Sequence, residues 1–181
     1  MRIISGKYKA MRFEPPTTIT ARPTTDFAKE SLFNVLTHYV DFEGLRVLDL
    51  FSGTGSISYE FASRGAVEVT AVEMSERHIA FIKKIIHKLN INQMRVLRAD
   101  VFRYIEHCTA TYDVVFADPP YQLDNIAALP DAIINRQLLS ESGVCVLEHG
   151  AANSFVKHPC FVEERKYGNV HFSFFKPIHS K

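Results

Sequence analysis

Short apolar runs alternate with helical patterns over most of this chain. Five apolar runs have the length of buried strands, and they lie at residues 45–50, 67–72, 94–98, 112–117 and 143–147. Helical spacing of apolar residues lies between them, most clearly from Ile79 to Leu89, where Asn90 is a plausible helix stop. Strand–helix alternation of this kind predicts a parallel sheet with helices on both faces.

The C-terminal end departs from this alternation. Residues 160–165 and 170–175 have strand character and are joined across Tyr167-Gly168-Asn169, so they predict an antiparallel pair. At the other end, residues 2–4 and 8–13 flank a glycine-containing turn and predict a short hairpin.

These elements together predict an α/β fold of the doubly wound type. We expect a seven-stranded, mostly parallel sheet with an antiparallel last strand, preceded by an N-terminal β-hairpin arm. One domain is expected over residues 1–181, with a basic hairpin arm and linker at 1–23 and an α/β core at 24–181. The core should begin with a helix that Thr24-Thr25-Asp26 caps and whose apolar face reaches Tyr39.

Composition narrows the class of protein. With 46% hydrophobic and 23% charged residues, the chain is an ordinary globular one, and no apolar stretch approaches the roughly 20 residues that a membrane span requires. The N-terminus lacks a secretion signal. Three cysteines lie far apart and predict free thiols in a reducing compartment, hence a cytoplasmic protein. The eight histidines show no ligand-like spacing, so we expect no metal site.

Charge is distributed unevenly along the chain. The first 25 residues carry a net charge of +4, which leaves about −3 for the remainder of a chain with +1 in total. A basic arm on a near-neutral body suits a polyanionic partner, although surface lysines on a solvated strand pair would give the same composition. The basic residues of this segment are Arg2, Lys7, Lys9, Arg12 and Arg22.

Carboxylates follow or end four successive predicted strands. They are Asp49, Glu73, Asp100 and Asp118. Singly, each is also explained as a helix cap or a surface acid, but side chains at the carboxyl ends of parallel strands meet at one edge of the sheet, where ligands bind.

The loop after the first strand predicts the type of ligand. Gly53 and Gly55 permit a tight turn and a close approach of the backbone, but Ser58 occupies the third glycine position of a dinucleotide loop. Asp49 would repel a pyrophosphate and attract a cationic group. Glu73 can accept from ribose hydroxyls, and Asp100 can accept from an adenine amino group. S-adenosylmethionine contains all three features.

The tetrapeptide Asp118-Pro119-Pro120-Tyr121 ends the fourth strand and suits a nucleobase with an exocyclic amino group. Proline has a fixed φ and no N–H, so the turn is set and carbonyl oxygens are left to accept hydrogen bonds. Tyr121 could stack on a base, a contact worth roughly 1–3 kcal/mol. Alone, the tetrapeptide is equally well explained as a strand-ending turn.

At these residues the chain resembles class I S-adenosylmethionine-dependent methyltransferases, and more closely the family that methylates guanine N2 in bacterial small-subunit ribosomal RNA. The resemblance covers nearly the whole chain. Its most discriminating part is Arg-Pro-Thr-Thr-Asp ahead of the first core strand. The matching segments are Arg22–Asp26, Glu30–Asn34, Asp49–Gly55, Arg64–Ala66 and Asp118–Tyr121. Lys29 departs from the family, which usually has arginine there.

The resemblance implies a Rossmann-like class I methyltransferase fold and a role for each motif. Asp118, Pro119 and Tyr121 would form the catalytic centre. S-adenosylmethionine would be bound by Asp49, Phe51, Gly53, Gly55, Glu73, Asp100 and Val101. Ribosomal RNA would be bound by Arg2, Lys7, Arg12, Arg22 and Thr24, the last two of which could equally contact the cofactor.

Three rival functions share some of these features. An adenine-N6 methyltransferase acting on DNA or RNA would share the tetrapeptide, but a DNA enzyme usually needs a recognition domain for which 181 residues leave little room. A nicotinamide-dependent oxidoreductase would share the fold, and an RNA-binding module would share the basic arm. We expect a monomer without membrane association, acting on naked RNA or on an assembled small-subunit particle.

Overall fold

A single mixed sheet forms the centre of the computed structural model, which describes residues 1–17 and 25–178. Its strand order is β3-β2-β1-β4-β5-β7-β6, and only the pairings of β7 are antiparallel. The strands are β1 (Arg46–Leu50), β2 (Glu68–Glu73), β3 (Met94–Arg98), β4 (Tyr112–Ala117), β5 (Leu139–His149), β6 (Phe161–Tyr167) and β7 (Val170–Phe175). The predicted doubly wound sheet with one antiparallel last strand is therefore confirmed.

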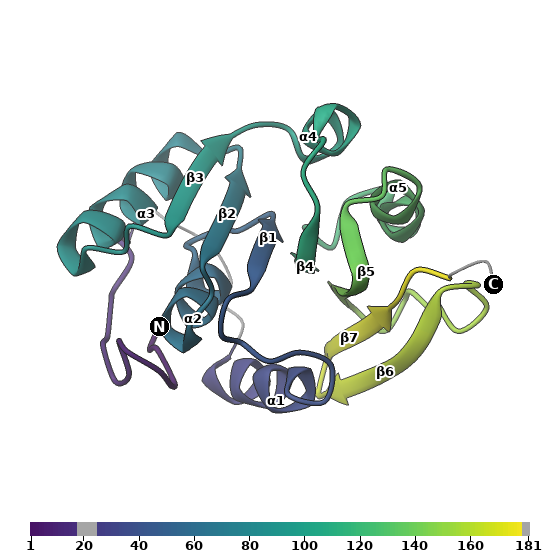
Figure 1. The fold of residues 1–181 in the computed structure, drawn as a ribbon, viewed down its shortest axis with the longest axis horizontal. Coiled ribbons are helices and arrows are strands. Elements are labelled where there is room, and N and C mark those ends of the chain that lie inside the picture. The colour runs from purple at the N-terminus through teal and green to yellow at the C-terminus, as the bar shows by residue number, and fades with distance from the viewer. Residues whose placement is uncertain (18–24, 179–181) are drawn as a thin grey trace.

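Helices cover both faces of the sheet (Figure 1). One apolar cluster joins the sheet to α1, α2 and α3, and a second joins it to α4, α5 and a short 3₁₀ turn. The helices are α1 (Asp26–Leu36), α2 (Ser56–Arg64), α3 (Glu76–Leu89), α4 (Val101–His107) and α5 (Leu129–Asn135), with the 3₁₀ turn η1 at Ile126–Ala128. None of the described helices is long and apolar enough to cross a membrane.

Local sequence signals fix the ends of the helices. Thr25 caps α1 by accepting from the Ala28 N–H at 3.1 Å. Asn90 ends α3 in the left-handed conformation, as its position predicted. The expected α1 face extends too far, because the helix stops at Leu36 and Tyr39 lies beyond it. The Tyr39 ring instead stacks on Phe174 with centroids 5.2 Å apart.

The N-terminal segment folds back on itself as the predicted hairpin, with an antiparallel bridge between Arg2 and Arg12. Met1 and Phe13 exchange backbone hydrogen bonds at 3.0 and 3.1 Å, and the Ile3 N–H donates to the Met11 carbonyl at 3.0 Å. The next backbone donors along this segment bond side chains of α2. Glu60 accepts from the N–H groups of Ile4 and Ser5, at 2.8 and 3.0 Å, and Ser63 accepts from Tyr8.

Close packing holds the same segment against α2. At Gly6, with φ of +80°, an added Cβ would lie 1.8 Å from the Ser63 carbonyl oxygen, so only glycine fits there. Ile3, Tyr8 and Phe13 are buried in the apolar cluster beneath. The predicted arm is therefore part of the core surface.

Candidate active site

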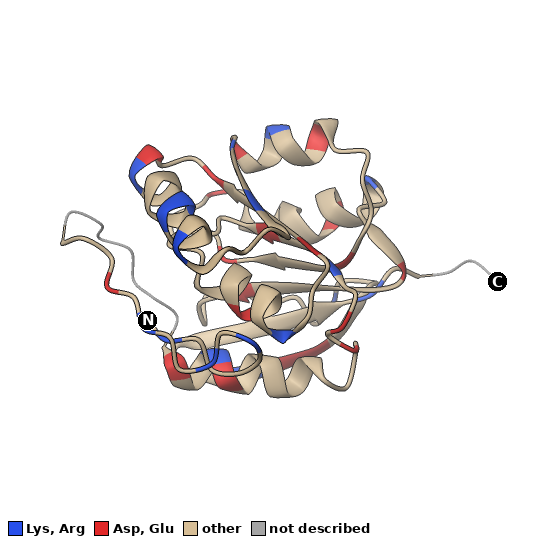
Figure 2. Cartoon of the chain, turned by 60° about the vertical axis from the view of Figure 1, so that its left-hand side comes forward, with Lys and Arg blue, Asp and Glu red and all other residues tan. Residues whose placement is uncertain are grey.

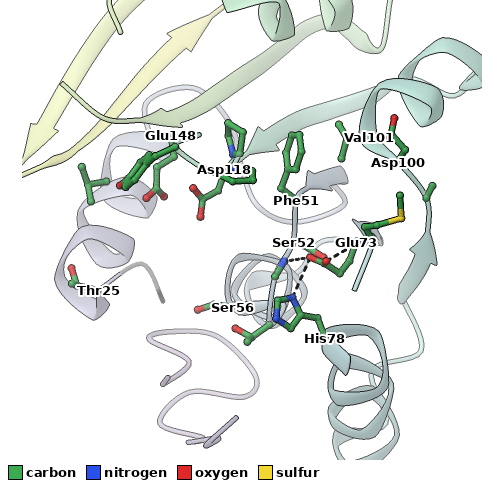
Figure 3. A pocket seen from close by; sticks show the side chains of 18 residues that line it. Thr25, Phe51, Ser52, Ser56, Glu73, His78, Asp100, Val101, Asp118 and Glu148 are labelled. Carbon is green, nitrogen blue, oxygen red and sulfur yellow. Dashed lines mark hydrogen bonds and ion pairs between the residues drawn. The ribbon is translucent and has the colours of Figure 1, made fainter. Parts of the chain in front are cut away.

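A cavity of about 560 Å³ lies at the edge of the sheet where the parallel strands end (Figure 3). Loops after β1, β2, β3 and β4 contribute to its wall, together with the ends of α1, β5 and β7. The lining residues are Thr25, Phe51, Ser52, Gly53, Thr54, Ser56, Glu73, Met74, His78, Ala99, Asp100, Val101, Asp118, Pro119, Pro120, Tyr121, Glu148 and Val170. The predicted meeting of strand-end residues is thus found for Glu73, Asp100 and Asp118.

Glu73 is fixed at the end of β2 by backbone donors. Its carboxylate accepts from the N–H of Gly53 at 2.8 Å and from those of Met74 and Ser75 at 2.9 and 2.8 Å. The Nδ1 atom of His78 lies 3.5 Å from the same carboxylate. Glu73 therefore ties the glycine-rich loop to the start of α3 and still faces the cavity (Figure 3).

The glycine-rich loop itself contains an unusual backbone conformation. Phe51 has φ of +59°, which is rare for a bulky residue and carries strain. The next residue, Ser52, has a buried hydroxyl that finds no hydrogen-bond partner within residues 1–17 and 25–178. A polar lining atom left unsatisfied in this way marks the loop as a place for a polar ligand.

Asp100 and Val101 line the far end of the cavity. The Asp100 carboxylate caps α4 by accepting from the Arg103 N–H at 3.0 Å, and Val101 is almost fully buried. One carboxylate oxygen is used in the cap, so the other can accept from a ligand beside the apolar valine. Both roles considered for Asp100 are therefore compatible.

Asp118 follows β4 and points into the cavity (Figure 3). Burial raises the pKa of its carboxyl to about 7. No cation of the described part of the chain forms an ion pair with it. Pro119 is buried behind it, and Tyr121 is half exposed at the rim.

Two residues predicted to contact the cofactor are not brought to the cavity wall. Asp49 lies inside β1, faces α2 and accepts from the Ser58 hydroxyl. Burial raises the pKa of its carboxyl to about 7. Gly55 begins α2 with φ of +82°, and an added Cβ would come within 2.9 Å of the Tyr59 ring. Both residues support the loop from behind, because strand alternation turns Asp49 away from the cavity.

Several lining residues were missed by sequence reasoning. Thr54 and Ser56 belong to the glycine-rich loop, and Thr25 stands at the N-terminus of α1. His78 comes from α3 and Glu148 from the end of β5. Thr54 and Ser56 could have been identified because they belong to the glycine-rich loop. Whether the other three side chains reach the cavity depends on strand register and on the rotation of the helices, which the sequence does not show.

The residues predicted to bind RNA have different surroundings. Lys7 and Arg12 are exposed, whereas the Arg2 guanidinium lies 3.5 Å from Asp26. Figure 2 shows further Lys and Arg positions on α3, on the same side as the N-terminal segment. Lys88 of α3 lies over the Phe13 ring at 5.9 Å, so the two basic elements are in contact. Arg22 and Thr24 lie outside the described residues.

A polar cluster joins β5, β6 and β7 away from the cavity wall. Nitrogen or oxygen atoms of His149, Glu164 and His171 lie within 4.8 Å of one another, a grouping that sequence spacing did not reveal. Protein groups already satisfy them: Ser173 bonds His149 at 2.8 Å, and Glu164 bonds both His171 and Lys166 at 3.1 Å. Burial lowers the pKa of His149. The cluster is accounted for as a hydrogen-bond network.

Comparison with known proteins places the chain among related sequences. The family model described as "Conserved hypothetical protein 95" matches residues 1–176. A protein of Buchnera aphidicola (subsp. Baizongia pistaciae) named "Ribosomal RNA small subunit methyltransferase D" is 30% identical, over 99% of this chain and 93% of its own. The Escherichia coli K12 protein of the same name is 25% identical, over 88% and 79%.

Solved structures repeat the same architecture. The hypothetical protein TTHA0928 of Thermus thermophilus superposes with a TM-score of 0.84 and 26% identity, over 97% of this chain and 99% of its own. SMU.776, solved in complex with SAH, has a TM-score of 0.62 and 21% identity, over 81% and 49%, which shows a shared fold.

Proposed function

The chain belongs to the family described as "Conserved hypothetical protein 95", and on that premise we propose that it is an S-adenosylmethionine-dependent methyltransferase of small-subunit ribosomal RNA. We further propose that the acceptor is the exocyclic N2 of a guanine. The single observation that carries the proposal is the juxtaposition of Asp118 and Glu73 in one cavity, one carboxylate suited to an amino group and the other to a ribose.

The cavity lining fits the cofactor. Glu73 would accept from ribose hydroxyls, and Asp100 with Val101 would hold the adenine through one polar and one apolar contact. The Ser52 hydroxyl, which needs a partner, and the close backbone at Gly53 would meet the remaining polar groups. When bound, S-adenosylmethionine supplies an electrophilic methyl group on a sulfonium centre. The similar fold of SMU.776, which binds SAH, supports this choice.

Asp118 and Pro119 would prepare the acceptor nitrogen. The Asp118 carboxylate and the Pro119 carbonyl accept the two amino hydrogens, which aims the nitrogen at the methyl group. The same two acceptors stabilise the positive charge that develops on the nitrogen during transfer. This role requires ionised Asp118, and its pKa of about 7 leaves a substantial ionised fraction at neutral pH.

The reaction is balanced without a further reactant. With S-adenosylmethionine held by Glu73 and Asp100, the C–N bond would form as the methyl–sulfur bond breaks, and the electron pair of that bond would remain on the sulfur. The methylated nitrogen then loses one of its hydrogens as a proton, to Asp118 or to water. Because the protonated methylamino group of a base is very acidic, Asp118 need not be a strong base.

Tyr121 would hold the target base at the rim. Tyr121 is 50% exposed, so part of the residue is accessible from outside the cavity. An enzyme acting on a base needs an unstacked nucleotide, and aromatic stacking compensates in part for the stacking that the base gives up in RNA. The exposed Lys7 and Arg12 would contact phosphates of the surrounding RNA.

The choice of RNA is supported by the names of the relatives. The Buchnera and Escherichia coli proteins are named as methyltransferases of small-subunit ribosomal RNA. Free thiols at all three cysteines agree with a reducing cytoplasm as the place of action. We expect the protein to act as a monomer.

A methyl-transfer assay tests the proposal. Purified protein and labelled S-adenosylmethionine are incubated with naked small-subunit RNA, with partly assembled subunits from cells lacking the protein, and with DNA. Label is expected in RNA only, at one guanine, and nuclease digestion followed by mass spectrometry locates it on N2. Label at adenine N6 would replace the proposal with the adenine alternative, and no transfer to any nucleic acid would overturn it.

A further inference from the structure

Glu148 is a second carboxylate at the target end of the cavity. It is 3% exposed and stands next to last in β5. Ala117 of β4 pairs with Leu147 of β5, so the residues that follow, Asp118 and Glu148, are neighbours at the ends of adjacent strands. Paired strands lie only about 4.8 Å apart. In Figure 3 both carboxylates lie on the same side of the cavity.

We propose that Glu148 determines the choice of base by accepting the N1–H of the target guanine while Asp118 accepts from its N2 amino group. This inference rests on the proposed function and adds the group that recognises the base.

The chemistry of the purine edge supports this assignment. Guanine presents N1–H beside the N2 amino group, so two neighbouring donors face the same direction, and two neighbouring carboxylates match them. Adenine has a lone pair at N1, which a carboxylate would repel. A site that presents a carboxylate oxygen to a donor discriminates strongly against an analogue with a lone pair at that position, because the two lone pairs repel each other.

The stacking residue lies where this arrangement requires it. An added Cβ on Gly150 would come within 3.9 Å of the Tyr121 ring, so the ring lies close to the backbone two residues after Glu148. A base stacked on Tyr121 can then direct its edge toward Glu148 and Asp118. Tyr121 would thereby contact the face of the purine, and Asp118 and Glu148 would contact its edge.

The test compares guanine with 2-aminopurine at the mapped position. 2-Aminopurine keeps the amino group but has a lone pair at N1 in place of N1–H, and it lacks O6, so the change in preference on replacing Glu148 is what reports on N1. We expect wild-type protein to prefer guanine by roughly 10⁴-fold in kcat/KM. Glu148→Gln should reduce this preference to within about tenfold, because the glutamine amide can donate to the N1 lone pair or accept from N1–H. Glu148→Ala should lower the turnover of the guanine substrate without raising the turnover of the 2-aminopurine substrate.

Matched controls separate specificity from folding. Glu141→Gln changes an exposed glutamate at the opposite end of β5 and should leave the preference unchanged. Calorimetric affinity for S-adenosylmethionine and the thermal unfolding midpoint should be retained in Glu148→Gln. Wild-type transfer to guanine with an unchanged preference in Glu148→Gln would overturn this inference alone. Failure of wild-type protein to methylate guanine at all would overturn the proposed function with it.

Discussion

Glu60 is fully buried and Asp118 is half-buried, and the surroundings of these two carboxylates differ completely. Glu60 of α2 is fully buried and accepts from Arg64 at 2.9 Å and from two backbone N–H groups, with the Lys29 ammonium 3.9 Å away. Asp118 faces a cavity, and the described residues supply no ion pair to it. Burial alone therefore does not tell a structural carboxylate from one available for function. The hydrogen-bond and ion-pair partners of the carboxylate have to be considered as well.

Glu60 also faces Lys29, the residue at which the chain departs from the family pattern. The Lys29 ammonium is buried and donates to the Arg2 carbonyl and to Ser56. Burial lowers the pKa of Lys29, and the Glu60 charge opposes that shift. Lys29 thus fastens the N-terminal segment to the core, so its contact is structural.

The largest expected effect comes from removing the structural carboxylate. Glu60→Ala should destabilise the protein by about 3–5 kcal/mol, because Lys29 and Arg64 lose a buried partner. Urea unfolding monitored by circular dichroism measures this loss. Glu68→Ala is the matched control: Glu68 pairs with Arg46 and Arg95 at the surface and should contribute less than about 1 kcal/mol. Equal losses in the two variants would contradict the comparison.

Removing Asp118, the carboxylate that we propose acts in the reaction, should leave the fold intact and lower the rate of methyl transfer. Asp118→Ala is expected to lower kcat by about 10²–10³-fold, since one preorganised interaction with the developing charge is removed. Single-turnover methyl transfer on the mapped RNA measures it, and cofactor affinity should stay within a factor of roughly three. Asp124→Ala, at an exposed position in the same loop, should be silent. Near-normal turnover by Asp118→Ala would remove it from the mechanism.

Glu73 holds backbone N–H groups as Glu60 does and faces the cavity as Asp118 does. We expect its replacement to have an effect of intermediate size. Glu73→Ala is expected to weaken S-adenosylmethionine binding by roughly 1.5–3 kcal/mol, the range for hydrogen bonds to a charged group. Titration calorimetry gives the affinity. Glu73→Ala also removes the acceptor of the Gly53 N–H. Glu73→Gln keeps one acceptor oxygen and should therefore recover part of the lost affinity. Glu76→Ala, on the exposed first turn of α3, serves as the control. Unchanged affinity in Glu73→Ala would place Glu73 outside the cofactor site.

The strand pattern was largely predictable because buried strands need runs of apolar residues. Predicted and observed strands differ by one or two residues at most ends. β5 is the exception, since it extends from Leu139 to His149 with an irregular register near Tyr112, and only its apolar middle was recognisable. The end of that strand was placed at residue 147, so Glu148 was missed.

Side-chain direction limited the prediction of the site. Asp49 and Asp118 have the same chemistry and both lie near strand ends, but Asp49 is still within β1, where the alternation turns it toward Ser58. A shift of one residue along a strand therefore decides whether a side chain points into the cavity or into the core. The N-terminal hairpin was recognisable from its own sequence, but its attachment to α2 was not. The N–H groups of Ile4 and Ser5 donate to Glu60, 56 and 55 residues away, a contact that no local pattern encodes.

The pH dependence of stability tests the surroundings of Asp118 in a second way. The pKa of Asp118 is about 7 in the folded state, whereas the ordinary pKa of an aspartate is 3.8. The folded protein therefore holds a proton that the unfolded chain releases between these values, and stability falls as pH rises through this window. Asp118→Asn should relieve this penalty, giving no gain near pH 4 and a gain of up to about 4 kcal/mol above pH 7, the free-energy equivalent of a pKa raised from 3.8 to about 7.

Chemical unfolding of Asp118→Asn at pH 5 and pH 8 provides the measurement. Asp124→Asn, at the exposed position of the same loop, should follow wild type at both pH values. A gain that is equal at the two pH values would show that the Asp118 carboxyl does not titrate in this window.

The smallest expected effect concerns the basic surface that Glu60 and Lys29 hold in place. Replacing Lys7 and Arg12 with alanine should flatten the salt dependence of RNA binding by roughly 0.7–0.9 log units for each phosphate that is no longer neutralised. Filter binding between about 50 and 200 mM salt measures the slope. Lys83 and Lys84 are exposed on the neighbouring α3, and their double alanine variant asks whether the surface extends there. The exposed Arg136 and Lys157 form the control pair. If the Lys7 and Arg12 variant keeps the wild-type slope, the segment is fastened to the core for reasons other than RNA contact.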